Sequence, residues 1–230
     1  MKSRSIYSNS SGKGWLQKVY SKREAVNFEQ TSSRFEVLNS YKHQVHPQLE
    51  LDEDDECWIV KQRFTSNAKK FLFFSNEQLK KIARKLDEFA KVDLFHGDLC
   101  FSNISFDSDG DALFFDWEVS LEVTGKKGIV LRTSPYCLHP DDKEFNRISK
   151  KTDLFGLAAI TLISCHHPSW RSGLSFDDKK RLILANYLEV SYTSSYSDLI
   201  ENMTRSILRR RTVLSPDRQA VPRRVFTPHS

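Results

Sequence analysis

Three polar side chains in the middle of the sequence have the types and spacing that phosphoryl transfer requires. Asp98 lies in the stretch 95–103, Asn103 follows five residues later, and Asp116 comes 13 residues after Asn103 (116 − 103 = 13). Moving a phosphoryl group from a nucleotide to a hydroxyl needs a carboxylate that orients the hydroxyl and hard oxygen ligands that hold Mg²⁺ against the phosphates. We therefore expect Asp98 to be the catalytic base and Asn103 and Asp116 to be the metal ligands.

The residues around Asp98 resemble the catalytic loop of the protein-kinase-like superfamily. That loop has the pattern H-R-D-L-x-x-x-N, and residues 96–103 read H-G-D-L-C-F-S-N. The resemblance implies an α+β, two-lobed protein-kinase-like fold with a reduced β-rich N-lobe and a mainly helical C-lobe. It also implies an enzyme, an ATP-dependent kinase that moves the γ-phosphate of ATP to a hydroxyl with Mg²⁺ as cofactor. In that loop His96 is expected to form structural hydrogen bonds.

Two upstream segments are similar to the nucleotide-binding part of the same superfamily. Residues 16–20, Leu-Gln-Lys-Val-Tyr, look like the strand that carries a phosphate-binding lysine, at Lys18. Residues 34–38, Arg-Phe-Glu-Val-Leu, resemble the helix whose glutamate pairs with that lysine, at Glu36, with Glu29 as the alternative. The resemblance therefore implies that Lys18, held by Glu36, grips the nucleotide phosphates.

Downstream segments extend the resemblance to most of the chain, from about Trp15 to Tyr187. Residues 133–141, T-S-P-Y-C-L-H-P-D, are similar to the end of a kinase activation segment. Because that segment looks like a platform for docking a peptide, we expect a Ser/Thr protein kinase. Asp153 matches the helix residue that braces the catalytic-loop backbone in the family, which is a structural role.

Departures from the family pattern leave other functions open. Only 17 residues precede Lys18, so we expect the first strand and the phosphate-covering loop to be missing or replaced, with Gly12 and Gly14 in a turn between strands. Gly97 occupies the position where the family has an arginine that binds a phosphate group on the activation segment. The D-W-E sequence at 116–118 is reminiscent of aminoglycoside and choline phosphotransferases. The alternatives are a kinase of a small molecule or a lipopolysaccharide sugar, and a pseudokinase that acts as a binding module.

Hydrophobic periodicity and turn residues predict the elements that must position these side chains. Runs of β-branched and aromatic residues predict strands over 15–20, 57–60, 101–106 and 112–115, the last two around the turn 107–110. Apolar spacing predicts helices over 23–42, 76–89, 153–164 and 177–188. We divide the chain into a reduced N-lobe at 1–65, a C-lobe with the catalytic loop at 66–204, and a basic C-terminal tail at 205–230.

Composition and charge exclude several classes of protein. With 39% hydrophobic and 28% charged residues, 230 residues can bury a core. The net charge of +5 is concentrated at 205–230, where seven arginines face one acid and one aromatic, so we expect a solvated terminus or last helix and no nucleic-acid role. The longest weakly polar run, 154–165, is too short to span a membrane. Scattered cysteines and no secretory leader favour a cytoplasmic protein whose partners are ATP and a protein or small-molecule hydroxyl acceptor.

Overall fold

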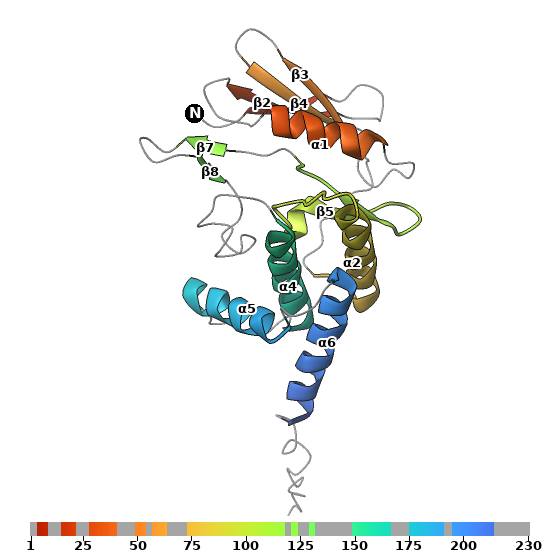
Figure 1. Cartoon of the computed structure of the whole chain (residues 1–230), viewed down its shortest axis with the longest axis vertical. Coiled ribbons are helices and arrows are strands. Elements are labelled where there is room, and N and C mark those ends of the chain that lie inside the picture. The colour runs from red at the N-terminus through yellow and green to blue at the C-terminus, as the bar shows by residue number, and fades with distance from the viewer. Residues whose placement is uncertain are drawn as a thin grey trace, which may run out of the picture.

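The computed structural model describes residues 4–8, 15–21, 28–40, 49–53, 57–63, 73–117, 121–123, 129–131, 149–166, 175–190 and 195–213. Within these residues, five α-helices and small antiparallel sheets form an α+β fold, which confirms the predicted class (Figure 1). A four-stranded sheet with helix α1 lies at one end of the molecule, and helices α2, α4, α5 and α6 lie at the other.

The four-stranded sheet fixes the strand that carries Lys18. Its strands run antiparallel in the order β1-β2-β4-β3, with bounds β1 Arg4–Ser8, β2 Trp15–Ser21, β3 Leu49–Glu53 and β4 Cys57–Arg63. Lys18 therefore sits in an internal strand, where its Cα partners are Ser5 on one side and Val60 on the other. The sequence predicted β2, β4 and a turn between strands at Gly12 and Gly14, but it gave no bounds for β1 or β3. Gly12 and Gly14 lie between two paired strands, although their own placement is outside the described residues.

Helix α1 spans Phe28–Ser40, shorter than the predicted range of 23–42, and it contacts β3. Phe35 and Leu38 are buried, three residues apart and so on one face of the helix. The side chain of Glu29, the alternative partner for the lysine, is outside the described residues. The helix thus uses one narrow apolar face to hold its position beside the sheet.

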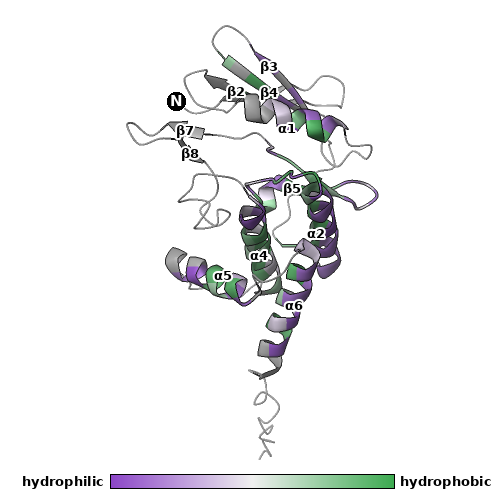
Figure 2. Ribbon diagram, viewed as in Figure 1, coloured by the Kyte–Doolittle hydropathy of each residue, from purple (hydrophilic) through white to green (hydrophobic). Residues whose placement is uncertain are grey.

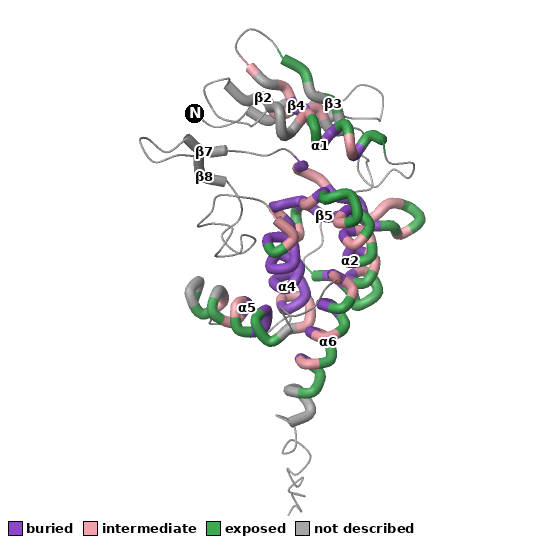
Figure 3. The backbone as a smooth tube through the Cα atoms, in the orientation of Figure 1, coloured by how far each residue is buried: buried purple, intermediate pink, exposed green. Residues whose placement is uncertain are grey.

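Four helices build the larger part of the core: α2 Asn76–Ala90, α4 Lys150–His166, α5 Phe176–Val190 and α6 Tyr196–Val213. Helix α4 is apolar along most of its length and buried, and α2 turns an apolar face toward it (Figures 2 and 3). Ser75 caps α2 in a capping box with Gln78, and the helix begins at residue 76 as predicted. None of the helices in the described residues combines the length and apolar character that crossing a bilayer demands.

The boundary predicted at residue 205 falls inside α6. Met203 and Ile207 are both buried, so the helix packs on the core on each side of that point. A basic composition does not end a helix, because arginine has high helix propensity and suits the negative C-terminal end of the helix dipole. Residues 205–213 therefore belong to the folded helical part.

Two short hairpins follow the segment 95–103. The first pairs β5 Ile104–Phe106 with β6 Ala112–Phe114, as predicted, although residues 101–103 form a 3₁₀ helix and no strand. The second pairs β7 Leu121–Val123 with β8 Ile129–Leu131. The segment 133–141, which resembles an activation segment, is outside the described residues.

Candidate functional site

Asp98 and Asn103 are joined by the Asn103 side chain. Its Nδ2 donates to the backbone oxygen of Asp98 at 2.9 Å and to Asp98 Oδ2 at 3.2 Å. The 3₁₀ turn makes this contact possible, because Asn103 N–H donates to the carbonyl of Cys100 at 3.1 Å and brings the two residues round to face each other. The amide oxygen Oδ1 lies on the other side of the group, where Ser102 Oγ donates to it at 3.2 Å. Asn103 thus fixes the Asp98 carboxylate and keeps an oxygen for a further partner.

Asp116 is brought to the same loop by the β5–β6 hairpin. The N–H of Phe115 donates to the carbonyl of Asn103 at 2.9 Å, which ties the end of the hairpin to the loop. Asp116 then adopts a φ of 60°, a left-handed conformation that is uncommon for residues other than glycine. Such residues cluster at functional sites, although aspartate also adopts this conformation in turns, as Asp93 does after α2 at a φ of 54°. From this position Asp116 Oδ1 forms an ion pair with Lys18 Nζ at 2.7 Å.

The ion pair of Lys18 differs from the expected one. The Lys18 side chain is 17% exposed and that of Asp116 is 35% exposed, so the pair is partly shielded from water. Glu36 is exposed, and no ion pair joins it to Lys18 in the described part of the chain. At 100° per residue, Glu36 lies roughly 130° around α1 from the centre of the face made by Phe35 and Leu38. The structure therefore brings together Lys18, Asp98, Asn103 and Asp116, and leaves Glu36 apart.

The backbone before Asp98 is held by a buried carboxylate from α4. Asp153 Oδ2 accepts the N–H of His96 at 2.6 Å, and Oδ1 accepts the N–H of Gly97 at 2.7 Å. These bonds confirm the bracing role expected for Asp153. One helical turn later, a Cβ atom on Gly156 would lie 3.0 Å from Leu99 Cβ and 3.1 Å from its carbonyl oxygen. Glycine at this position lets the helix approach the loop closely.

His96 has the structural role that the sequence predicts. Its Nδ1 accepts the N–H of Asp98 at 3.2 Å, which leaves the proton on Nε2, and Nε2 then donates to the carbonyl of Phe115 at 2.7 Å. The ring is buried against Trp117, with centroids 4.6 Å apart. Because both ring nitrogens are occupied, His96 connects the Asp98 loop to the Asp116 segment and is not placed for acid–base catalysis.

Burial raises the pKa of the nearby Cys100 thiol, which keeps it protonated and a poor nucleophile.

Arg34 of α1 is a residue whose role the sequence did not reveal. Its guanidinium donates to the carbonyls of Phe95, of His96 at 3.4 Å and of Trp117 at 3.1 Å. Burial lowers the pKa of Arg34 to about 10, and the negative charge of Asp153 partly opposes that change. The side chain is still protonated at neutral pH. In the sequence, Arg34 is only a basic residue next to the apolar face of a predicted helix. That pattern does not identify the carbonyl groups, in another part of the chain, to which it donates.

The donor set at this site suits a magnesium ion that arrives with a nucleotide. Among the described residues there is no group of three or more His, Cys, Asp or Glu side chains that could hold a metal ion alone. Mg²⁺ is commonly held by one or two protein oxygens, with phosphates and water completing the shell. Asn103 Oδ1 and the Asp116 carboxylate offer this limited set of hard oxygen ligands.

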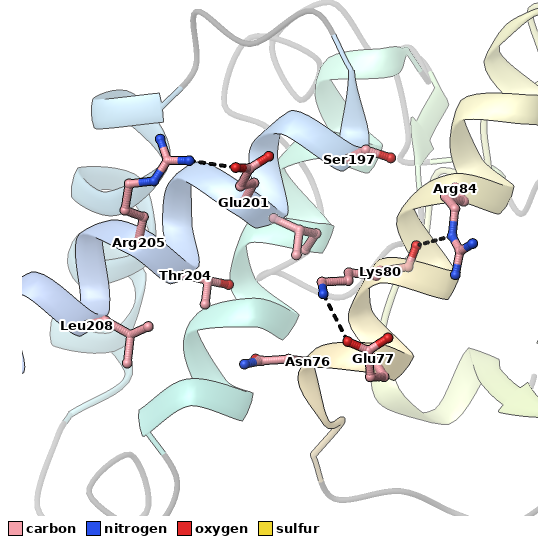
Figure 4. Close-up of a pocket in the computed structure, with 10 residues that line it drawn as sticks. Asn76, Glu77, Lys80, Arg84, Ser197, Glu201, Thr204, Arg205 and Leu208 are labelled. Carbon is pink, nitrogen blue, oxygen red and sulfur yellow. Dashed lines mark hydrogen bonds and ion pairs between the residues drawn. The ribbon is translucent and has the colours of Figure 1, made fainter.

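A separate cavity of about 710 Å³ lies between α2 and α6 (Figure 4). Four of its charged side chains pair within their own helix, Lys80 with Glu77 on α2 and Arg205 with Glu201 on α6. None of the residues predicted for the site lines this cavity.

Comparison with protein-family models and with curated protein sequences gives no match to this chain, so its function is inferred from the fold and the geometry of the site.

Proposed function

We propose that this chain is an ATP-dependent phosphotransferase with a two-lobed, protein-kinase-like fold that moves the γ-phosphate of ATP to a hydroxyl. The observation that carries the proposal is the meeting of Lys18 with Asp98, Asn103 and Asp116, because Lys18 lies in strand β2, 80 residues before Asp98 in the sequence (98 − 18 = 80). Carboxylate, amide and ammonium groups in one place match the needs of a nucleotide triphosphate with bound magnesium.

In this proposal each side chain has one task. Lys18 binds phosphate oxygens, Asp98 orients the acceptor hydroxyl and accepts its proton, and Asn103 and Asp116 hold Mg²⁺. The chemistry that Mg²⁺ would supply there is neutralisation of the phosphate charge. Before nucleotide binds, the 2.7 Å pair between Lys18 and Asp116 keeps the two charges compensated. With nucleotide bound, Lys18 would contact phosphate oxygens, and the Asp116 carboxylate would be available to hold the metal.

A Ser/Thr protein is our first choice of acceptor, because residues 133–141 resemble a peptide-docking activation segment. A small molecule or a lipopolysaccharide sugar is the second. The H-G-D-L and D-W-E sequences favour it, and Gly97 has a φ of 86°, a backbone conformation in which the arginine of the protein-kinase pattern would be strained. Both acceptors use the same four side chains.

The test is transfer of label from γ-labelled ATP, with separate counting of labelled protein and labelled small metabolites. Asp98→Ala and Asp116→Ala should each lower transfer by at least about 10²-fold, the scale of a lost general base. Asp109→Ala is the matched control, since Asp109 is an exposed aspartate in the hairpin turn and should leave transfer unchanged. Unchanged transfer in either site variant, with the fold intact by circular dichroism, contradicts the assigned roles.

A thermal-shift titration, combined with the label-transfer assay, distinguishes an enzyme from a pseudokinase. Binding of ATP and Mg²⁺ to the folded state raises the unfolding temperature in proportion to RT ln(1 + [L]/Kd). Nucleotide stabilisation without any label transfer would favour the binding module over the enzyme. The loss of that stabilisation in Lys18→Met would identify Lys18 as a phosphate ligand.

A further inference from the structure

We propose that Arg34 is a positioning residue for the phosphotransfer proposed above: from α1 it fixes the loop that carries Asp98 and the segment that carries Asp116 relative to each other. The inference depends on the proposed function for its effect on catalysis. Its structural part can be tested without any activity.

The three carbonyls that Arg34 contacts lie on both sides of the site. Phe95 and His96, 61 and 62 residues away in sequence, come just before Asp98. Trp117, 83 residues away, comes directly after Asp116. One side chain from the sheet end of the molecule therefore joins the two segments that carry the proposed base and a proposed metal ligand.

The bonds of Arg34 and Asp153 fall on the same two peptide groups. In the peptide group between Phe95 and His96, the C=O accepts a hydrogen bond from Arg34 and the N–H donates one to Asp153. In the next peptide group, the C=O of His96 accepts a hydrogen bond from Arg34 and the N–H of Gly97 donates one to Asp153. Two consecutive peptide groups thus lie between a cation and an anion, each aligned with the charges at its two ends. Hydrogen bonds arranged in this way polarise and strengthen one another.

Arginine is suited to this position because of its shape. The guanidinium presents five N–H donors in a flat fork, which serves three carbonyls from two segments at once. The ammonium group of a lysine is a compact point charge on a shorter side chain, so a lysine at this position could replace only some of these hydrogen bonds. Since Arg34 is on α1 and Asp153 is on α4, the Asp98 loop is held from both ends of the molecule.

The effect on catalysis should appear mainly in kcat. Arg34 bonds to backbone oxygens and to none of the four site side chains, so its loss displaces Asp98 and Asp116, while the backbone of Lys18 is still held in strand β2 by its two neighbouring strands. Displacement of reacting groups by about 1 Å is enough to lower a rate by about 10²-fold. We expect Arg34→Met to lower kcat by about that factor, with KM for ATP changed by less than about threefold, and Arg34→Lys to recover part of the loss.

The experiment measures amide hydrogen exchange by mass spectrometry in the full chain, with kcat and KM measured in parallel. Arg34→Met should speed exchange of the 95–98 and 115–117 segments by about tenfold, and Arg34→Lys by less, while exchange in α6 stays unchanged. Arg84→Met is the matched control, because Arg84 is exposed on α2 and bonds only weakly to Lys80 of its own helix, with Nε 3.5 Å from the carbonyl.

Each outcome decides the inference. Faster exchange confined to the two segments in Arg34→Met, and not in Arg84→Met, supports it. Unchanged exchange in the two segments overturns it, as does an equal rise in α6, which indicates general destabilisation. If Arg34→Met does not fold, the same comparison is made with Arg34→Lys. If the wild-type chain transfers no phosphate, the proposed function fails, and the exchange result still decides whether Arg34 holds the two segments.

Discussion

Replacing Asp153 by asparagine should destabilise the fold by several kcal/mol and abolish the proposed phosphate transfer. The side chain is 1% exposed, and its two oxygens accept N–H groups at 2.6 and 2.7 Å. Asparagine keeps one oxygen and turns an NH₂ group toward the other N–H. The change loses a charge-assisted hydrogen bond, worth about 1.5–3 kcal/mol, and leaves a buried donor unsatisfied, which costs about 1–3 kcal/mol. It also removes the negative charge that faces Arg34 through the two peptide groups, so we expect about 3–5 kcal/mol in all.

Urea denaturation followed by circular dichroism measures this change in the free energy of unfolding, with the m value as a check on two-state behaviour. Asp87→Asn is the matched control, because Asp87 also accepts two backbone N–H groups, from Tyr196 and Ser197 at 2.8 and 3.1 Å, but these belong to α6, and among the described residues Asp87 has no hydrogen bond to the loop that carries Asp98. The control should cost about 1–2 kcal/mol and leave phosphate transfer unchanged. A cost for Asp153→Asn no larger than that of the control, or normal transfer, refutes the reasoning.

Three further predictions concern the surroundings of the site. Gly156→Ala should cost about 1–3 kcal/mol by overpacking and slow phosphate transfer, because the new methyl group meets the Cβ and carbonyl of Leu99, as denaturation and turnover assays will show. Alkylation of Cys100 by iodoacetamide at pH 8 should be several-fold slower in the folded than in the unfolded chain, by peptide mass spectrometry, since burial raises its pKa and keeps the thiol neutral. Ser75→Ala should cost about 1 kcal/mol by removing the cap bonded to Gln78, with turnover unchanged, and a loss of turnover would contradict the separation of α2's N-terminus from the site.

The elements with strong local patterns could be predicted from the sequence. The strand at Lys18, the β5–β6 hairpin and the apolar helix that contains Asp153 follow from β-branched runs, turn residues and apolar composition. The adjacency of Asp98, Asn103 and Asp116 was predictable as well, because a turn and a hairpin bring nearby residues together. The bracing role of Asp153 was predicted from the family resemblance alone, and the bonds of its two oxygens to the N–H groups of His96 and Gly97 bear it out.

The remaining features depend on tertiary contacts that a local pattern does not contain. The rotation of α1 about its axis decides whether Glu36 or Arg34 faces the site, and Phe35 and Leu38 set that rotation by packing on the core. Strand β1 is too short and polar, with the sequence Arg-Ser-Ile-Tyr-Ser, to be distinguished from a coil without its partner strand. The continuation of α6 past residue 205 likewise depends on burial of Ile207.

The left-handed backbone at Gly97 limits how this chain can be redesigned. A side chain at a φ of 86° costs about 1–2 kcal/mol, and the N–H of this residue is already committed to Asp153. Installing an arginine here, to let a phosphorylated loop switch the protein on, would therefore deform the turn before it could recruit any phosphate. An engineered switch is better placed in the packing of α1. A small tilt of that helix would move the Arg34 guanidinium and, with it, the backbone of the loop.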